Sequence, residues 1–215
     1  MTDINMIETD RLLTTTKQVR RRLDLDREVP TALLLECIDI ANQAPMGGNL
    51  EMNRWLIVTD PEIKTKLGEL YASVGRPYLD STSEATEGRT RRIKESTRFL
   101  VENMHRAPAI ILPLRVGRAP GADEGLVWAA NYWGSVLPGV WSFQLAARAR
   151  GLGSCWTTFH LPHDAAVAEL LGIPADVGQV ALLPVAFYTG ESFRPAPRQD
   201  VHKITYLNGW EQPVD

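Results

Sequence analysis

The 215-residue sequence predicts an α+β fold in which long helices pack on a small sheet. A stretch without charge extends from Leu126 to Ala147 and holds three of the six tryptophans. Its apolar residues occur all round the helical wheel, which is typical of a helix inside a large core. The other predicted helices are separated by only a few short apolar runs that have the character of strands. Long helices with scattered strands favour the α+β class.

The amino-acid composition indicates which class of protein this is. Hydrophobic residues make up 44% and charged residues 23%, as in an ordinary soluble domain, and the length suits one domain over residues 1–215. The net charge of −3 argues against general nucleic-acid binding. The acidic first residues lack the order of a secretory signal, and Cys37 and Cys155 form no disulfide framework, so we expect a cytoplasmic protein.

An alternative interpretation of the uncharged stretch is a membrane-spanning helix, because the stretch is long enough to cross a bilayer. Several polar or helix-weakening residues in it argue against that alternative, and we expect no membrane association. These are Asn131, Gly134, Ser135, Pro138, Gly139, Ser142 and Gln144.

One face of this central helix carries only small or polar residues. Small side chains let another backbone approach closely, so we expect a second helix to cross here. Pro138 should kink the helix, because it removes a hydrogen bond and clashes with the preceding turn. The face consists of Asn131, Ser135, Pro138, Gly139, Ser142 and Ala146.

Periodicity and turn residues predict the remaining elements. Helices are expected at 6–16, 31–44, 62–73, 89–105 and 163–171, and strands at 55–59, 108–114, 154–158 and 179–188. Residues 75–88 are polar and weakly periodic, which predicts a mobile loop, and 75–105 is expected to form a lid or substrate region. Residues 190–215 contain prolines and aromatics and predict an extended arm.

Several familiar signatures are absent. Gly151-x-Gly153 follows a helix and precedes a strand, the reverse of the dinucleotide fingerprint. Cys155, His160 and His163 could be metal ligands, but a fourth ligand is not evident, so no metal is expected. Nothing in the sequence indicates an activated Cys155 thiolate.

Arginines and one glycine-containing loop remain as candidates for binding. Arg20–Arg22 and Arg198 offer forked donors that match phosphate, although they can equally balance surface acids such as Asp24 and Asp26. The loop at 45–49 exposes backbone amides and an Asn, which could bind the edge of a planar heterocycle.

Four blocks of the sequence resemble FMN-dependent nitroreductases. They are TTTKQVRRRLDLDREVP, ANQAPMGGNLEMNRWLIV, GLGSCWTTFHL and FRPAPR…NGW, in the family's order and over nearly the whole chain. The resemblance implies a nitroreductase-like α/β sandwich that works as an intertwined homodimer, with FMN at two interface sites. It also implies that the central helix packs in the dimer core and that residues 190–215 form a dimerisation arm, exchanged between protomers.

The resemblance also implies which residues bind the cofactor. Arg20 matches the family's phosphate-binding block and Lys17 keeps its charge, whereas Thr16, Gln18 and Met46 depart from the usual residues. By position, the implied FMN-binding residues are Lys17, Gln18, Arg20, Pro45, Met46, Gly47, Asn49, Glu51, Trp156, Thr157, Thr158 and Arg198.

The activity implied is transfer of a hydride from NADH or NADPH, through FMN, to a small planar aromatic acceptor such as a nitroaromatic or a quinone. The flavin carries the chemistry, so no catalytic side chain is required. An alternative is a sequestering or sensing dimer that binds flavin without efficient turnover. A nucleic-acid module built on Arg20–Arg22 is a more distant alternative, because no aromatic platform lies near it in the sequence.

Overall fold

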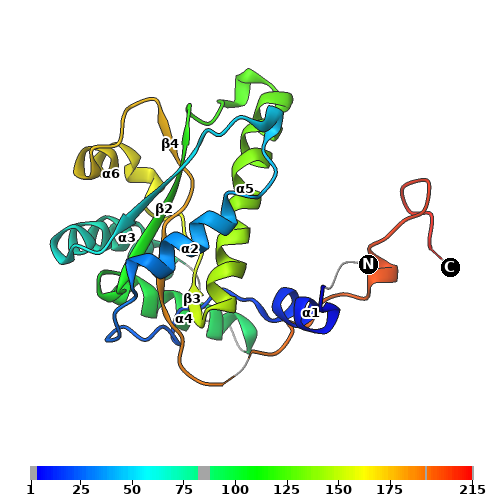
Figure 1. Cartoon of the computed structure of the whole chain (residues 1–215), viewed down its shortest axis with the longest axis horizontal. Helices are drawn as coiled ribbons and strands as arrows, with labels where there is room; N and C mark the ends of the chain where they lie inside the picture. Colours follow the sequence, from blue (N-terminus) through cyan, green and yellow to red (C-terminus); the bar gives the residue numbers. More distant parts are fainter. Residues whose placement is uncertain (1–3, 82–87, 192, 215) are drawn as a thin grey trace. The chain divides into compact units, whose positions relative to one another are not determined.

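The computed structural model describes residues 4–81, 88–191 and 193–214. The chain forms two compact units, one of residues 16–191 and one that combines residues 1–15 with 192–215. The larger unit contains an antiparallel sheet with helices on both faces (Figure 1). The predicted α+β class is therefore confirmed.

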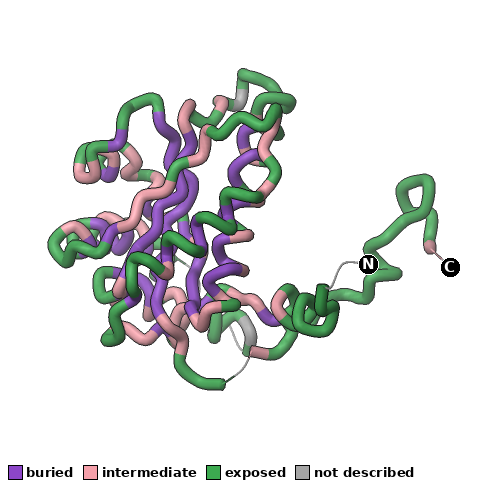
Figure 2. The backbone as a smooth tube through the Cα atoms, in the orientation of Figure 1, coloured by how far each residue is buried: buried purple, intermediate pink, exposed green. Residues whose placement is uncertain are grey.

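Five short strands form the sheet in the order β1-β2-β5-β3, and β4 pairs with another part of β2. The strands are β1 (Asn53–Val58), β2 (Ala109–Val116), β3 (Leu152–Ser154), β4 (Val177–Gln179) and β5 (Leu183–Phe187). The central strand β2 is buried almost along its whole length (Figure 2). A strand covered on both faces has a nearly continuous apolar sequence, as this one does.

Alternating residues of β2 divide the core into two layers. Ala109 and Ile111 pack with α2 (Thr31–Ala41) and α5 (Leu126–Ala149). Ile110 and Leu112 pack on the other face with α3 (Pro61–Ser81), α4 (Arg89–Asn103) and α6 (Asp164–Leu171). Single 3₁₀ turns join several elements, at Gly47–Asn49, Met104–Arg106, Ala122–Glu124 and Leu161–His163.

The central helix α5 has its small-residue face covered by the same chain. A Cβ on Gly139 would lie 3.4 Å from the Ala41 carbonyl oxygen of α2, and the Ser135 hydroxyl accepts from the Gly47 N–H at 3.0 Å. The expected close crossing of a second helix is confirmed, and that helix is α2. Ser135, Gly139 and Ala146 of the small face are therefore buried within this chain, whereas Asn131 is exposed.

A different face of α5 is exposed in this chain. Leu137 and Trp141 are 38% and 39% exposed and lie one helical turn apart, and Gly134 and Ala130 continue the same line. At the N-terminal end of α5, Leu126, Val127 and Trp128 are also exposed. We refer to Ala130, Gly134, Leu137 and Trp141 as the α5 stripe.

Two predicted strands differ from the observed ones. The apolar run 179–188 is divided between β4 and β5, because three residues, 180–182, lie opposite two residues of β2, 112 and 113. Such an extra residue is a bulge, and Pro113 cannot donate to the ladder at that point. The strand expected at 154–158 is instead β3, which ends at Ser154, and only Thr157 makes a further isolated bridge, with Leu182.

The prediction of a loop at 75–88 is wrong for residues 75–81. Helix α3 continues through Gly75 and Pro77 to Ser81, and residues 82–87 lie outside the described part. A Cβ on Gly75 would lie 2.5 Å from Val101 Cγ2, so only glycine lets α3 approach α4 this closely. Leu79 is buried, and the Tyr78 ring packs on Phe159. Tertiary packing therefore keeps a polar segment helical.

The smaller unit has little regular structure. Its helix α1 (Met6–Thr15) agrees with the amphipathic helix expected there. Residues 193–214 are mostly extended, with one 3₁₀ turn at Val201–Lys203 and a Tyr206–Trp210 ring contact. No helix in the described ranges has the length and hydropathy needed to cross a membrane.

Candidate functional site

Two groups of predicted binding residues lie in the larger unit. The first, here the Gln18 group, contains Lys17, Gln18, Arg20 and residues 156–158. Gln18 forms a parallel bridge with Ser154, and the Val19 N–H donates to the Ser154 carbonyl at 2.8 Å. A Cβ on Gly153 would touch the Val19 side chain at 3.0 Å, so glycine permits this approach. Segments far apart in the sequence are thus brought side by side.

The Gln18 carboxamide is held by an internal network. Its Oε1 accepts from the Trp156 N–H and from Gln144 Nε2, the latter at 3.3 Å. Gln144 is only 2% exposed and also donates to Ser154 Oγ at 3.0 Å. Gln18 Nε2 carries two N–H groups, and one of them donates to Gln144 Oε1 at 3.5 Å. The second N–H of this exposed side chain is the donor left to face a ligand.

Arg20 is half-buried next to the Cys155 thiol. Burial raises the pKa of Cys155 to about 11, and the charge and hydrogen bond of Arg20 oppose part of that rise. Burial also raises the pKa of Tyr71, with a smaller opposing effect from Arg20. Cys155 is therefore a neutral packing residue, and Arg20 has no acidic partner in the described ranges.

The other residues of this group differ in accessibility. Lys17 is half-buried and, in the part of the chain described, takes part in no ion pair. Thr158 is exposed, whereas Thr157 is buried and its hydroxyl donates to the Leu182 carbonyl at 2.7 Å. The Thr157 hydroxyl therefore donates its hydrogen bond within the fold and not to a ligand. Trp156 is half-buried, with its backbone N–H on Gln18.

The neighbouring arginines contact other groups of the chain, and in the described ranges no ion pair joins them to Asp24 or Asp26. Arg21 lies 3.8 Å from Glu95, and Arg22 Nε donates to the Thr189 carbonyl at 2.5 Å. Asp26 pairs with Arg106 instead of with an arginine of the 20–22 run. Of Arg20–Arg22, therefore, Arg20 is the one placed beside the Gln18 group.

The second group, here the glycine loop, contains Pro45, Met46, Gly47, Asn49 and Glu51. Gly48 and Asn49 have φ values of 62° and 53°, in the left-handed region. A Cβ on Gly47 would lie 2.5 Å from Asn131 Oδ1, so glycine is needed for contact with α5. Residues 44–46, with Asn49, Glu51 and residues of α2 and β1, line a polar cavity of about 520 Å³.

The two groups contact opposite halves of α5. The glycine loop bonds to Ser135 and the Gln18 group bonds to Gln144. Nine residues of helix separate these anchors, which is about 14 Å along the axis. The α5 stripe residues Leu137 and Trp141 lie between them in the sequence.

Arg198 belongs to the smaller unit and is exposed. Its part in cofactor binding stays a prediction. Sequence reasoning missed Gln144 and Ser135, which hold the two groups in place. The signal available was their position as polar residues within an otherwise apolar helix, since buried polar groups need hydrogen-bond partners.

His160 is a buried histidine that the site does not use. It is 0% exposed, and among the described residues neither ring nitrogen has a hydrogen-bond partner. Burial lowers its pKa to about 4, against a smaller opposing effect from Asp164. Among the described residues no three His, Cys, Asp or Glu side chains are grouped to hold a metal ion.

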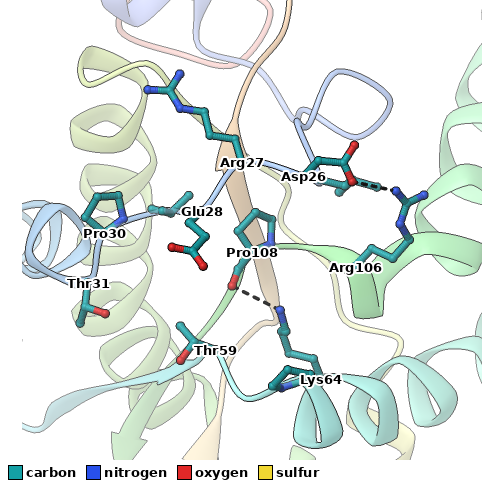
Figure 3. Close-up of a pocket in the computed structure, with 12 residues that line it drawn as sticks. Asp26, Arg27, Glu28, Pro30, Thr31, Thr59, Lys64, Arg106 and Pro108 are labelled. Carbon is teal, nitrogen blue, oxygen red and sulfur yellow. Dashed lines mark hydrogen bonds and ion pairs between the residues drawn. The ribbon is translucent and has the colours of Figure 1, made fainter.

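A further cavity of about 480 Å³ contains none of the predicted binding residues (Figure 3). Three of its charged side chains, Lys64, Asp26 and Arg106, are partnered within the chain, and Arg27 lies over the Phe187 ring. Lys64 Nζ donates to the Ala107 carbonyl at 2.8 Å, and Arg106 pairs with Asp26 at 3.2 Å. Burial lowers the pKa of Lys64, with Asp60 opposing. This cavity is therefore a weaker candidate than the surface beside Arg20.

Comparison with known proteins identifies relatives of this chain. The model of the nitroreductase family matches residues 15–187. An iodotyrosine deiodinase from Thermotoga neapolitana is 25% identical over 174 residues, which is 80% of this chain and 84% of that protein.

Solved structures share the fold. An oxidised iodotyrosine deiodinase bound to FMN and 3-iodo-L-tyrosine is 26% identical, with a TM-score of 0.69 and coverage of 93% of this chain and 98% of that one. A variant of an FMN- and NADPH-dependent nitroreductase from Sphigopyxis sp. strain HMH is 19% identical, also with a TM-score of 0.69, over 94% and 99% of the two chains.

Proposed function

The chain belongs to the nitroreductase family, and from that premise we propose that it is an FMN-dependent oxidoreductase. The observation that carries the proposal is the pair of half-buried cations, Lys17 and Arg20, beside the oriented Gln18 amide. Neither cation has an acidic partner in the described part of the chain. Partly desolvated cations without internal partners suit an anionic ligand.

The donor set fits FMN. Lys17 and Arg20 supply positive charge, Gln18 supplies an N–H donor held in one orientation, and the glycine loop exposes backbone beside a polar cavity. FMN, when bound, supplies the hydride-transfer chemistry. We assign Arg20 the role of stabilising negative charge near the ring and Arg198 that of anchoring the phosphate.

We infer that the site is completed by a second copy of the chain. Leu137 and Trp141, the exposed bulky residues of the α5 stripe, lie between the anchors of the two groups. If two α5 helices cross antiparallel at this stripe, twofold symmetry places the partner's glycine loop near this chain's Gln18 group. A homodimer would also cover Leu137 and Trp141. The C-terminal arm is proposed to add Arg198 to the same site.

The electron donor in this proposal is NADH or NADPH, and the acceptor is a small planar aromatic such as a nitroaromatic or quinone. A second candidate acceptor class is the halogenated aromatics. Its support is the resemblance, at 25–26% identity, to iodotyrosine deiodinase in sequence and in structure.

Absorbance of the purified protein tests the proposal. A yellow protein that bleaches anaerobically with NADH or NADPH, and recovers colour with nitrobenzene, menadione or 3-iodotyrosine, is the expected result. A protein that binds FMN but is not reduced by either nucleotide would support the alternative of a flavin-binding dimer. Failure of added FMN to bind at all would overturn both.

A further inference from the structure

A separate cavity of about 360 Å³ lies beside the outer end of β2 and the N-terminal half of α5. Its apolar walls come from Leu50, Met52, Val116, Trp128 and Tyr132, and Arg115 is one of its charged wall residues. We call it the Arg115 pocket. Its volume is within the range of ligand-binding cavities, about 300–1,000 Å³.

Arg115 is a cation that the fold buries without compensating its charge. It points to the α5 face of the sheet, because it follows Ile111 by four residues on β2. The residue is 6% exposed, yet no acidic side chain of the described ranges lies within ion-pair distance of it. Its hydrogen bond goes to Asn53 Oδ1 at 3.2 Å, and Asn53 is itself held by the Ser135 carbonyl.

A buried guanidinium with one neutral acceptor has donors left over. Arginine carries five N–H groups, and its forked geometry matches a carboxylate through two parallel bonds. Burial of an unpaired charge is costly, so a ligand that supplies the opposite charge would remove part of that cost. The remaining Arg115 donors therefore point to an anionic group in the pocket.

The walls indicate what the anion is attached to. The Tyr132 ring lies 5.3 Å from the Arg115 guanidinium, and the Trp128 indole and the Leu50 and Met52 side chains provide apolar surface. A bare inorganic oxyanion would leave this surface in contact with water. A flat apolar body that carries a carboxylate would cover it.

Two other charged residues line the pocket. Arg118 pairs with Asp164 at 2.5 Å, so its charge is compensated. Glu124 is exposed, and its Oε1 accepts from the Gly121 N–H at 3.2 Å, which holds it at the rim. Arg115 is thus the wall residue whose charge is both buried and uncompensated.

We propose that the Arg115 pocket binds the carboxylate of a small aromatic acid. The site goes beyond the proposed flavin chemistry, because it uses neither the Gln18 group nor Arg198. It borders Gly47 of the glycine loop, so a bound acid lies next to that loop. The binding itself does not depend on FMN.

Calorimetric titration of the full-length protein with benzoate, with and without added FMN, tests the site. Benzoate should bind the parent protein, and benzyl alcohol and inorganic phosphate should bind at least tenfold more weakly. Arg115→Met should weaken benzoate binding by about ten- to a hundredfold, because one charge-assisted contact is lost. Arg150→Met, a surface change outside the pocket, should bind benzoate like the parent.

Two further measurements separate a lost contact from a damaged fold. Arg115→Met should still bind benzyl alcohol as the parent does, which shows that the apolar walls remain. Glu124→Gln should tighten benzoate binding, since a nearby negative charge is removed. The proposal would be overturned if Arg115→Met bound benzoate as tightly as the parent does. It would also be overturned if the parent did not bind benzoate, or if it bound phosphate as tightly as benzoate. Absence of FMN binding would overturn only the flavin proposal.

Discussion

His160 is a residue whose burial has a measurable consequence for stability. Its pKa of about 4 in the folded protein lies below the ordinary value of 6.5, so the unfolded chain binds the proton more readily. The stability that comes from neutral His160 is complete above about pH 6.5 and is lost as the pH falls toward 4. The loss amounts to about 3 kcal/mol in the free energy of unfolding.

Urea unfolding at pH 7.0 and pH 4.5 measures this effect. His160→Met should lose less stability than the parent between these pH values, by roughly 2–3 kcal/mol. His163→Gln is the matched control, because His163 is half-buried and its Nε2 contacts Ser73 Oγ at 2.8 Å. The same loss in the parent and in His160→Met would show that His160 does not govern the acid transition.

Arg20 and Arg198 are predicted to act on different properties of bound FMN. Arg20→Gln should lower the flavin midpoint potential, because a reduced anionic ring loses more stabilisation than the oxidised ring. Arg198→Ala should weaken FMN binding by about ten- to a hundredfold while the potential of bound FMN stays the same. Redox titration and fluorescence quenching measure the two properties. If the potential follows Arg198 and not Arg20, the two roles are assigned the wrong way round.

At the scale of the element, α5 has one face covered by its own chain and one apolar stripe exposed. Replacing Leu137 and Trp141 with Glu should leave the fold of the monomer intact, because both side chains are more than a third exposed. It should weaken the proposed dimer by at least about a hundredfold, since each charge is buried twice in a twofold interface.

Sedimentation velocity at micromolar concentration checks the α5 prediction. Ile93→Glu is the control, since Ile93 is an exposed apolar residue, 50% accessible, on α4, on the opposite side of the sheet. A parent protein that sediments as a monomer would contradict the prediction. A variant with both Leu137→Glu and Trp141→Glu that stays dimeric would also contradict it.

At the scale of the whole molecule, the division into two units separates the core from the arm. Both core layers consist of residues between Val29 and Val185, within the larger unit. A chain that ends at residue 191 should therefore keep its helical circular dichroism. Its affinity for FMN should fall by at least tenfold, because Arg198 is removed. Unchanged FMN affinity after truncation would exclude Arg198 as a ligand.

The sequence alone determined the class of the fold and most of its elements. Uniform hydrophobicity indicated that α5 is a core helix, and apolar runs indicated β1, β2 and β5, because those signals are local and periodic. The four sequence blocks indicated the family, which the match over residues 15–187 confirms. The residues implied to bind FMN remain predictions.

Only the tertiary structure decided which neighbours those elements have. The polar segment after Gly75 is helical because Val101 and Phe159 pack against it, a contact that no local pattern reveals. The small-residue face of α5 meets α2 of its own chain, whereas Leu137 and Trp141 on another face of α5 stay exposed. The local sequence specifies whether the backbone prefers helix or strand, and it specifies which residues avoid water. Which surfaces meet depends on contacts between segments distant in the chain. These contacts placed Gln144 behind Gln18 and buried Arg115 with no acidic partner among the residues that the structure describes.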